Sequence, residues 1–137
     1  MRTFIDTSSL FKKYHLEEGS KKLFTIKKNV TEIIVSHITY LEITNTAYRL
    51  YHNKKITDQE LEILYRDINH DFPYYKKIPW DDKLEDHFFH WVRRYQIKSL
   101  DTIQLASAQC SKCQRVITSD KKQYDMAKNE FDDVIYI

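Results

Sequence analysis

Four acidic residues occupy positions from which their carboxylates could act together. Each follows a short apolar run or lies in the first turns of a predicted helix, and they are Asp6, Glu42, Asp101 and Asp120. Two carboxylates about 4 Å apart repel each other by several kcal/mol at an effective dielectric constant near 20, so a cluster is tolerable only when protons or a cation hold it. Oxygen ligands select hard cations, so the four carboxylates predict a Mg²⁺ or Mn²⁺ site rather than a Zn²⁺ site.

Each of the four carboxylates also has a simpler explanation when it is taken singly. An acid in the first turn of a helix is stabilised by the helix dipole, an aspartate can form a turn, and a helical glutamate can simply be solvated. Asp101 needs a further reason, because it opens the most apolar helix of the chain and a charge beside a buried helix is costly unless it is paired or metal-bound. We therefore expect Asp101 to be the least water-accessible of the four.

The elements that must position these acids alternate along the chain. Short β-prone runs at 3–5, 33–35, 116–117 and 134–137, with 74–78 as a further strand or an extended linker, are separated by segments of helical periodicity. This alternation predicts an α/β fold, a three-layer α/β/α sandwich with a short central parallel sheet of four to five strands. Ligands collect beyond the carboxyl ends of such strands, which is where the acids fall.

Capping residues and apolar stripes define the predicted helices. Thr57 and Glu60 stand in capping-box register, and Ser36 and Ser99 are expected to cap the helices that follow them. The helix at 38–51 is expected to turn one stripe inward, and the helix at 99–110 is apolar around most of its circumference and should be buried. The inward stripe of the first of these comprises Ile38, Leu41, Tyr48 and Tyr51, with Ala47 and Leu50 beside it.

Length, charge and composition favour a folded protein acting through side chains. The 137 residues fit one domain, 1–137, and no apolar run is long enough to cross a membrane, so we expect a cytoplasmic protein. A net charge of +2 is too small to indicate an electrostatic nucleic-acid binder. Gly19 is the one glycine, which argues against P-loop, Rossmann and nucleophile-elbow motifs, because these need several.

The motifs around the acids resemble those of the PIN domain family over the whole chain. The resemblance is carried by FIDTSSL at 4–10, Ser36 with Glu42, SLDTIQLASA at 99–108, and ITSD at 117–120 with Ala127 seven residues on. Within that family the short form is most similar to VapC-type toxins, the ribonucleases of toxin–antitoxin pairs. The sequence departs from the family at 129–131, where Asn-Glu-Phe replaces a glycine, and in ending at Ile137.

The resemblance implies a metal-dependent endoribonuclease with a cognate antitoxin. It implies that Asp6, Asp101 and Asp120 bind Mg²⁺ or Mn²⁺ and that Glu42 holds metal-bound water or a second ion. Metal-activated water would then hydrolyse an RNA phosphodiester, with no protein nucleophile. The hydroxyls expected to support the site are those of Thr7, Ser8 and Thr118. The family's habit and the aromatic segment 72–91 together predict a homodimer.

Alternatives to this interpretation remain open at the level of sequence. A PIN nuclease of RNA processing and a non-catalytic RNA-binding or scaffold module are the competing functions. A zinc clamp is possible if two helices touch, with His87, His90, Cys110 and Cys113 as ligands. Basic residues near the acids could follow a phosphate backbone or could be solvated, and they are Lys12, Lys13, Arg49, Arg93, Arg94, Lys98, Lys121 and Lys122.

Overall fold

A computed structural model describes residues 1–137 and places five parallel strands in one sheet. The strand order is β3-β2-β1-β4-β5, and every neighbouring pair is parallel. The predicted sheet of four to five strands is therefore confirmed, and segment 74–78 contains a strand. The strands are β1 (Arg2–Ile5), β2 (Glu32–Ser36), β3 (Lys76–Ile78), β4 (Arg115–Thr118) and β5 (Val134–Tyr136).

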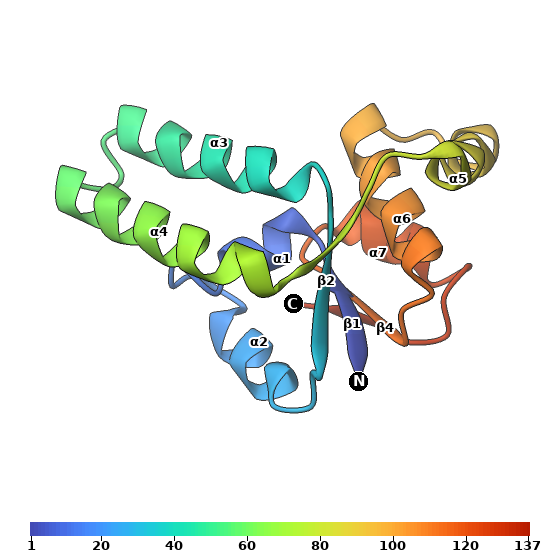
Figure 1. The fold of residues 1–137 in the computed structure, drawn as a ribbon, viewed down its shortest axis with the longest axis horizontal. Coiled ribbons are helices and arrows are strands. Elements are labelled where there is room, and N and C mark those ends of the chain that lie inside the picture. The colour runs from blue at the N-terminus through green and yellow to red at the C-terminus, as the bar shows by residue number, and fades with distance from the viewer.

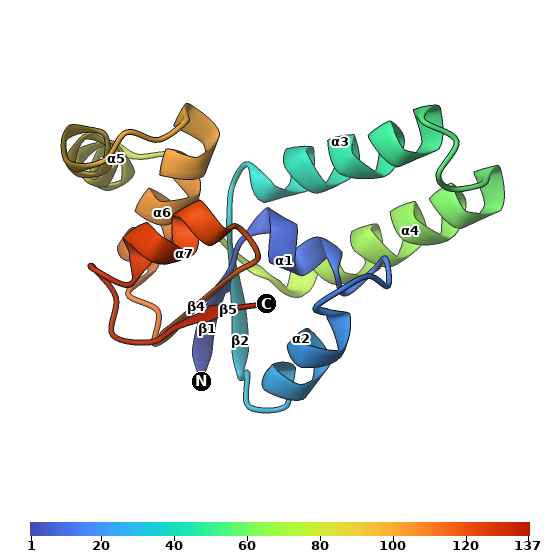
Figure 2. The ribbon, with the colours of Figure 1, turned by 180° about the vertical axis from the view of Figure 1, so that it is seen from behind.

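Helices cover both faces of the sheet, as the predicted three-layer sandwich requires. One face carries α1 (Thr7–Phe11), α2 (Ser20–Lys27), α3 (Thr39–His52) and α4 (Asp58–Asp71). The other carries α5 (Asp82–Arg94), α6 (Ser99–Ser111) and α7 (Lys121–Ala127) (Figures 1 and 2). Successive strand residues point to opposite faces, so Ile5 and Ile117 enter the first core while Phe4 and Val116 enter the second.

The buried stripe of the helix α3 agrees with the predicted one only in part. Its buried residues are Thr39, Ile43 and Ala47, spaced four apart, whereas Leu41 is 68% exposed and Tyr48 41% exposed. The prediction was right for Ile38 and Ala47, which are buried, and for Leu50 and Tyr51, which pack against the core, but it omitted Ile43 and turned Leu41 and Tyr48 inward. The contacts of α3 with α1 and α4 decide which side of the helix is covered. Figure 1 shows α3 and α4 side by side, reaching away from the sheet, so much of the α3 surface has no layer to cover it.

Helix starts agree with the predictions at one of three positions. Thr57 and Glu60 form both hydrogen bonds of a capping box at the start of α4. Ser99 instead lies inside α6, whose N-cap is Lys98, and α3 begins after Ile38 without a side-chain cap. Ser36 ends β2, and its hydroxyl oxygen accepts a hydrogen bond from the backbone N–H of Ile38 at 3.4 Å.

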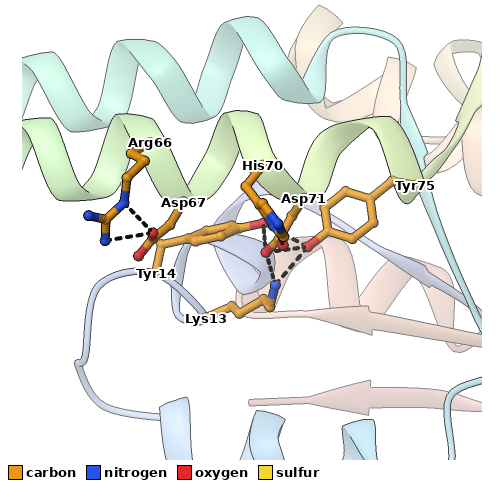
Figure 3. A network of polar contacts seen from close by, with 7 residues as sticks. All are labelled: Lys13, Tyr14, Arg66, Asp67, His70, Asp71 and Tyr75. Atoms are coloured by element: carbon orange, nitrogen blue, oxygen red, sulfur yellow. Dashed lines mark hydrogen bonds and ion pairs between the residues drawn. The ribbon is translucent and has the colours of Figure 1, made fainter.

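A polar network joins the segment after α1 to the end of α4. Lys13 Nζ donates to the carboxylate of Asp71 and, at 3.1 Å, to the hydroxyl of Tyr75 (Figure 3). The hydroxyl of Tyr14 also donates to Asp71, at 3.0 Å. The network thus ties the chain that follows α1 to the last turn of α4. No helix of the fold combines the length and apolarity that a membrane span requires.

Candidate functional site

The strand order places two of the four acids side by side. From β1 the chain first adds β2 and β3 on one side of the sheet and then crosses to add β4 and β5 on the other side. The strands β1 and β4 therefore flank the point at which the strand order reverses. Helices leave these two strands on opposite faces and open a crevice at their carboxyl ends. Asp6 follows β1 and Asp120 follows β4, and each is the N-cap of the next helix, where its carboxylate accepts a hydrogen bond from a backbone N–H.

The other two acids approach the crevice from the two helical layers. Glu42 lies in the first turn of α3 and Asp101 in the first turn of α6. All four carboxylates line one cleft of about 640 Å³. The structure thus brings together every acid that the sequence singled out, from four separate elements.

Asp6 is the most deeply buried of the four acids. Its side chain is 2% exposed, and its carboxylate accepts hydrogen bonds from the Ser9 amide at 2.9 Å and from the Thr118 hydroxyl at 2.6 Å. The Ser8 hydroxyl donates to both carboxylate oxygens, at 2.9 and 3.0 Å. Burial raises the pKa of Asp6 although these donors act to lower it. The carboxylate is therefore held in a fixed orientation without a positive partner.

Asp101 is more accessible than predicted. It is only partly buried, because α6 begins beside the open cleft and Leu100 is 52% exposed there. Burial raises the pKa of Asp101 most, and the charges of Asp120 and Glu42 raise it further. The expectation that Asp101 would be the least accessible acid was wrong, because Asp6 is buried more deeply.

Glu42 is oriented by hydrogen bonds from both sides of the cleft. The Thr7 hydroxyl donates to Glu42 Oε1 at 2.8 Å, and Gln104 Nε2 donates to the same oxygen at 2.6 Å. Thr7 thus contacts Glu42, whereas Ser8 and Thr118 contact Asp6. All three hydroxyls predicted to support the site lie against one of its acids.

No ion pair neutralises any of these carboxylates. None of the four acids takes part in an ion pair, although ten ion pairs occur elsewhere. No three acidic, histidine or cysteine side chains are close enough to hold one ion between them. Mg²⁺ commonly takes one or two carboxylates and completes its octahedron with water and substrate phosphate. The oxygen-only donors of the open cleft fit such a cation, and they do not form a closed cage.

The family of the chain follows from its sequence. The sequence model described as "PIN domain" matches residues 3–129. The chain belongs to the PIN domain family. A comparison with curated proteins gives no significant match.

Solved structures show the same fold at low sequence identity. A toxin–antitoxin complex from Klebsiella pneumoniae is 20% identical, with 97% of this chain and 95% of that chain covered and a TM-score of 0.69. VapBC-1 from nontypeable Haemophilus influenzae is 14% identical, covering 99% and 98%, with a TM-score of 0.71. The sarcin-ricin loop cleaving toxin VapC20 of Mycobacterium tuberculosis is 13% identical, covering 94% and 95%, with a TM-score of 0.67. These similarities extend over 94% or more of this chain.

The alternative zinc clamp is not formed in this PIN domain. No group of three or more potential ligands gathers around either cysteine. Cys110 and Cys113 pack against the core beneath α5 and α6 instead, and His90 lies 3.3 Å from the carboxylate of Glu130. The two cysteines are therefore part of the packing of this layer.

Sequence reasoning missed two glutamines of the cleft. Gln104 lies one turn after Asp101 on α6, and Gln123 lies three residues after Asp120 on α7. Both side chains are buried, at 3% and 5% exposure, and each donates to one of the acids. The available signal was the spacing of three residues from an acid, which places the amide on the same side of the helix.

Proposed function

We propose that this protein is a Mg²⁺- or Mn²⁺-dependent endoribonuclease that hydrolyses RNA phosphodiester bonds. The observation that carries the proposal is the convergence of Asp6, Glu42, Asp101 and Asp120 on one cleft of a PIN fold, where none of the four forms an ion pair. Four carboxylates that repel one another are unfavourable for folding alone, and a divalent cation is the partner that their oxygen donors fit.

Roles can be proposed for the residues from their positions. Asp6, Asp101 and Asp120 would hold the cation, and Glu42 would hold a water molecule or a second ion beside it. Thr118 and Ser8 keep the Asp6 carboxylate fixed, and Thr7 does the same for Glu42. When bound, the cation would supply an activated water and offset the charge that develops on the phosphate.

Positive side chains at the rim support a polyanionic substrate. Arg49 lines the cleft and forms no ion pair, whereas Lys12 lines it and pairs with Glu17 at 3.3 Å. Lys98 and Lys122 act on Asp101 through their charges, so they also lie near the acids. Three other basic residues of the predicted set are in ion pairs, Lys13 with Asp71, Arg94 with Glu130 and Lys121 with Asp125. Arg49, Lys98 and Lys122 would therefore offer positive charge to an RNA backbone that passes the cleft.

The biological role that we propose is that of a toxin held inactive by a cognate antitoxin, working in the cytoplasm as a homodimer. Complexes of toxin with antitoxin are prominent among the proteins that share this fold. A PIN nuclease of RNA processing is the alternative, and growth arrest on expression, relieved by the product of the adjacent gene, would distinguish the toxin from it.

Cleavage of total RNA by the purified chain tests the enzymatic proposal. We expect cutting with Mg²⁺ or Mn²⁺, none in excess EDTA, and loss of cutting in Asp120→Asn. Asp86→Asn is the control, because Asp86 is an exposed acid of α5 outside the cleft. Undiminished cleavage in EDTA would refute metal dependence, and RNA binding without cleavage in Mn²⁺ would support the non-catalytic module instead.

A further inference from the structure

Two buried amides hold the acids of the cleft in a fixed orientation. Gln104 Nε2 lies 2.6 Å from Glu42 Oε1, 2.9 Å from Thr7 Oγ1 and 3.3 Å from Thr39 Oγ1. Gln123 Nε2 donates to Asp101 Oδ1 at 3.2 Å, and the backbone N–H of Gln123 donates to Asp120 Oδ1 at 2.9 Å. Together the two glutamines contact three of the four acids.

The orientation of the Gln104 amide depends on the charge of Glu42. The oxygen Oε1 of Gln104 is buried and has no hydrogen-bond partner, which is an unfavourable state for a polar atom. Turning the amide over would bring that oxygen to the 2.6 Å position beside the carboxylate of Glu42, where two acceptors would face each other. The fold therefore leaves one acceptor unsatisfied and directs the amide nitrogen at the carboxylate.

The Gln123 side chain departs from its local helical role. A glutamine three residues after an N-cap commonly reaches back to the backbone of that N-cap and completes a capping box. Asp120 is the N-cap of α7 and accepts the backbone N–H of Gln123, yet the side-chain amide of Gln123 donates across the cleft to Asp101. One residue thereby links an acid of α7 to an acid of α6.

We propose that Gln104 and Gln123 are positioning residues, which set the carboxylates of Glu42 and Asp101 for cation binding. The inference rests on the proposed metal-dependent function. Each amide occupies one oxygen of its acid, at Glu42 Oε1 and Asp101 Oδ1, and so fixes the direction of the other oxygen. Residues that orient metal ligands in this way commonly change metal affinity or activity by about 10- to 100-fold when they are replaced.

Gln109 of the same helix provides a matched control. Gln109 Oε1 accepts the indole N–H of Trp91 at 2.8 Å and contacts none of the four acids. Gln109→Leu and Gln104→Leu therefore each remove from α6 a side-chain amide that forms hydrogen bonds. Only Gln104→Leu removes a contact with an acid of the cleft. Any effect that arises from loss of stability alone should appear in both variants.

Mn²⁺ binding and RNA cleavage form the first test. We expect Gln104→Leu to weaken Mn²⁺ binding, measured by the paramagnetic resonance of free Mn²⁺, by about tenfold or more, and to lower kcat with little change in KM for RNA. High Mn²⁺ should restore its activity. Gln109→Leu should bind Mn²⁺ as the wild type does. A folded Gln104→Leu protein with wild-type Mn²⁺ affinity and kcat would overturn the proposal for Gln104, and the same measurements on Gln123→Leu decide the case of Gln123.

The second test needs neither metal nor activity, so it separates this inference from the proposed function. In the ¹⁵N-labelled metal-free protein, Glu42→Ala should shift the side-chain amide resonances of Gln104 and leave those of Gln109 in place. Asp101→Ala should likewise shift those of Gln123. Unchanged Gln104 and Gln123 resonances would overturn the proposed contacts even if the wild type binds Mn²⁺. If the wild type binds no Mn²⁺ but these resonances shift, the proposed metal site is refuted, and the contacts of the two glutamines with the acids are supported.

Discussion

The carboxylate of Asp101 weakens the metal-free fold when it is ionised. Burial first, and then the charges of Asp120 and Glu42, raise its pKa above 3.8, while Lys98 and Lys122 act in the opposite direction. A raised folded-state pKa means that the protonated group favours the folded state and that this advantage is lost as the pH rises through the folded pKa. At neutral pH the ionised Asp101 therefore lowers the free energy of unfolding.

Asp101→Asn should stabilise the metal-free protein at pH 7. Asparagine keeps an oxygen that can accept from Gln123 and removes the charge, so we expect a gain of about 0.5–1 kcal/mol, reduced from the full electrostatic value because the side chain is partly exposed. Urea unfolding at several pH values measures this gain, which should disappear below pH 3.8, where the wild-type carboxyl is also protonated.

The cation should reverse the order of the two proteins. Metal that binds only the folded state raises its stability, so Mn²⁺ should raise the melting temperature of the wild type and change that of Asp101→Asn little. Equal stabilisation of both by Mn²⁺, with a metal-free variant less stable than the wild type, would show that Asp101 is a structural residue of α6 and that the proposed ligand set is wrong.

At the scale of elements, the Lys13–Asp71 network joins α1 to α4 and stabilises their junction. Burial alone would raise the pKa of Asp71, but hydrogen bonds from Lys13, His70 and Tyr14 outweigh it and lower the pKa to about 2. A folded-state pKa below the ordinary 3.8 means that the ionised group stabilises the fold above that pH and that this stability is lost as the pH falls toward 2.

Asp71→Asn should lower the free energy of unfolding by about 1–2 kcal/mol at pH 7. The difference from the wild type should shrink between pH 4 and pH 2, where the wild-type carboxyl is being protonated. The neighbouring pair of Arg66 and Asp67 is the control (Figure 3), because its side chains are 72% and 48% exposed. Asp67→Asn should change stability by less than about 0.5 kcal/mol, and an equal loss in both variants would contradict the assigned role of Asp71.

The elements of the fold were predictable where local signals and packing agree. The alternation of strands and helices depends on short-range patterns, and the capping box of Thr57 and Glu60 is specified within four residues. The buried stripe of α3 was predictable only in part, because the neighbouring α1 and α4 decide which side of that helix is covered. Ser99 has the residue type of a cap, but Lys98 already takes the extended conformation in which α6 starts.

The candidate site was predictable in its acids and not in the groups that orient them. Asp6 and Asp120 follow strands whose ends meet in any parallel sheet of this order, so the sequence locates them once the strands are recognised. Gln104 contacts Glu42 across 62 positions of the chain, and Gln123 contacts Asp101 across 22. The spacing of three residues places each glutamine on the same side of its helix as an acid, but the acid that each side chain contacts lies on another helix, and only the fold shows which one it is.

At the scale of the whole molecule, the aromatic segment 72–91 divides between core and surface. Phe72, Tyr75 and Trp91 are buried, which accounts for part of the segment by packing alone. Trp80 and Phe89 remain 48% and 42% exposed. Both rings pack against Phe88, with distances between ring centroids of 6.1 Å for Trp80 and 5.9 Å for Phe89. Neighbouring exposed aromatic rings of this kind are typical of protein interfaces.

The homodimer is therefore expected to form through the exposed rings of this segment. Light scattering should give a dimer mass for the wild type, and Trp80→Lys with Phe89→Lys should give a monomer, because each lysine replaces apolar contact area with a charge that must be desolvated. Tyr74→Lys is the control, since Tyr74 is 80% exposed and outside these ring contacts. The cleft lies at the carboxyl edge of the sheet and is formed within one chain, so the double variant should still cleave RNA. A monomer mass for the wild type at all workable concentrations would refute the dimer, and a dimeric double variant would place the interface on another surface.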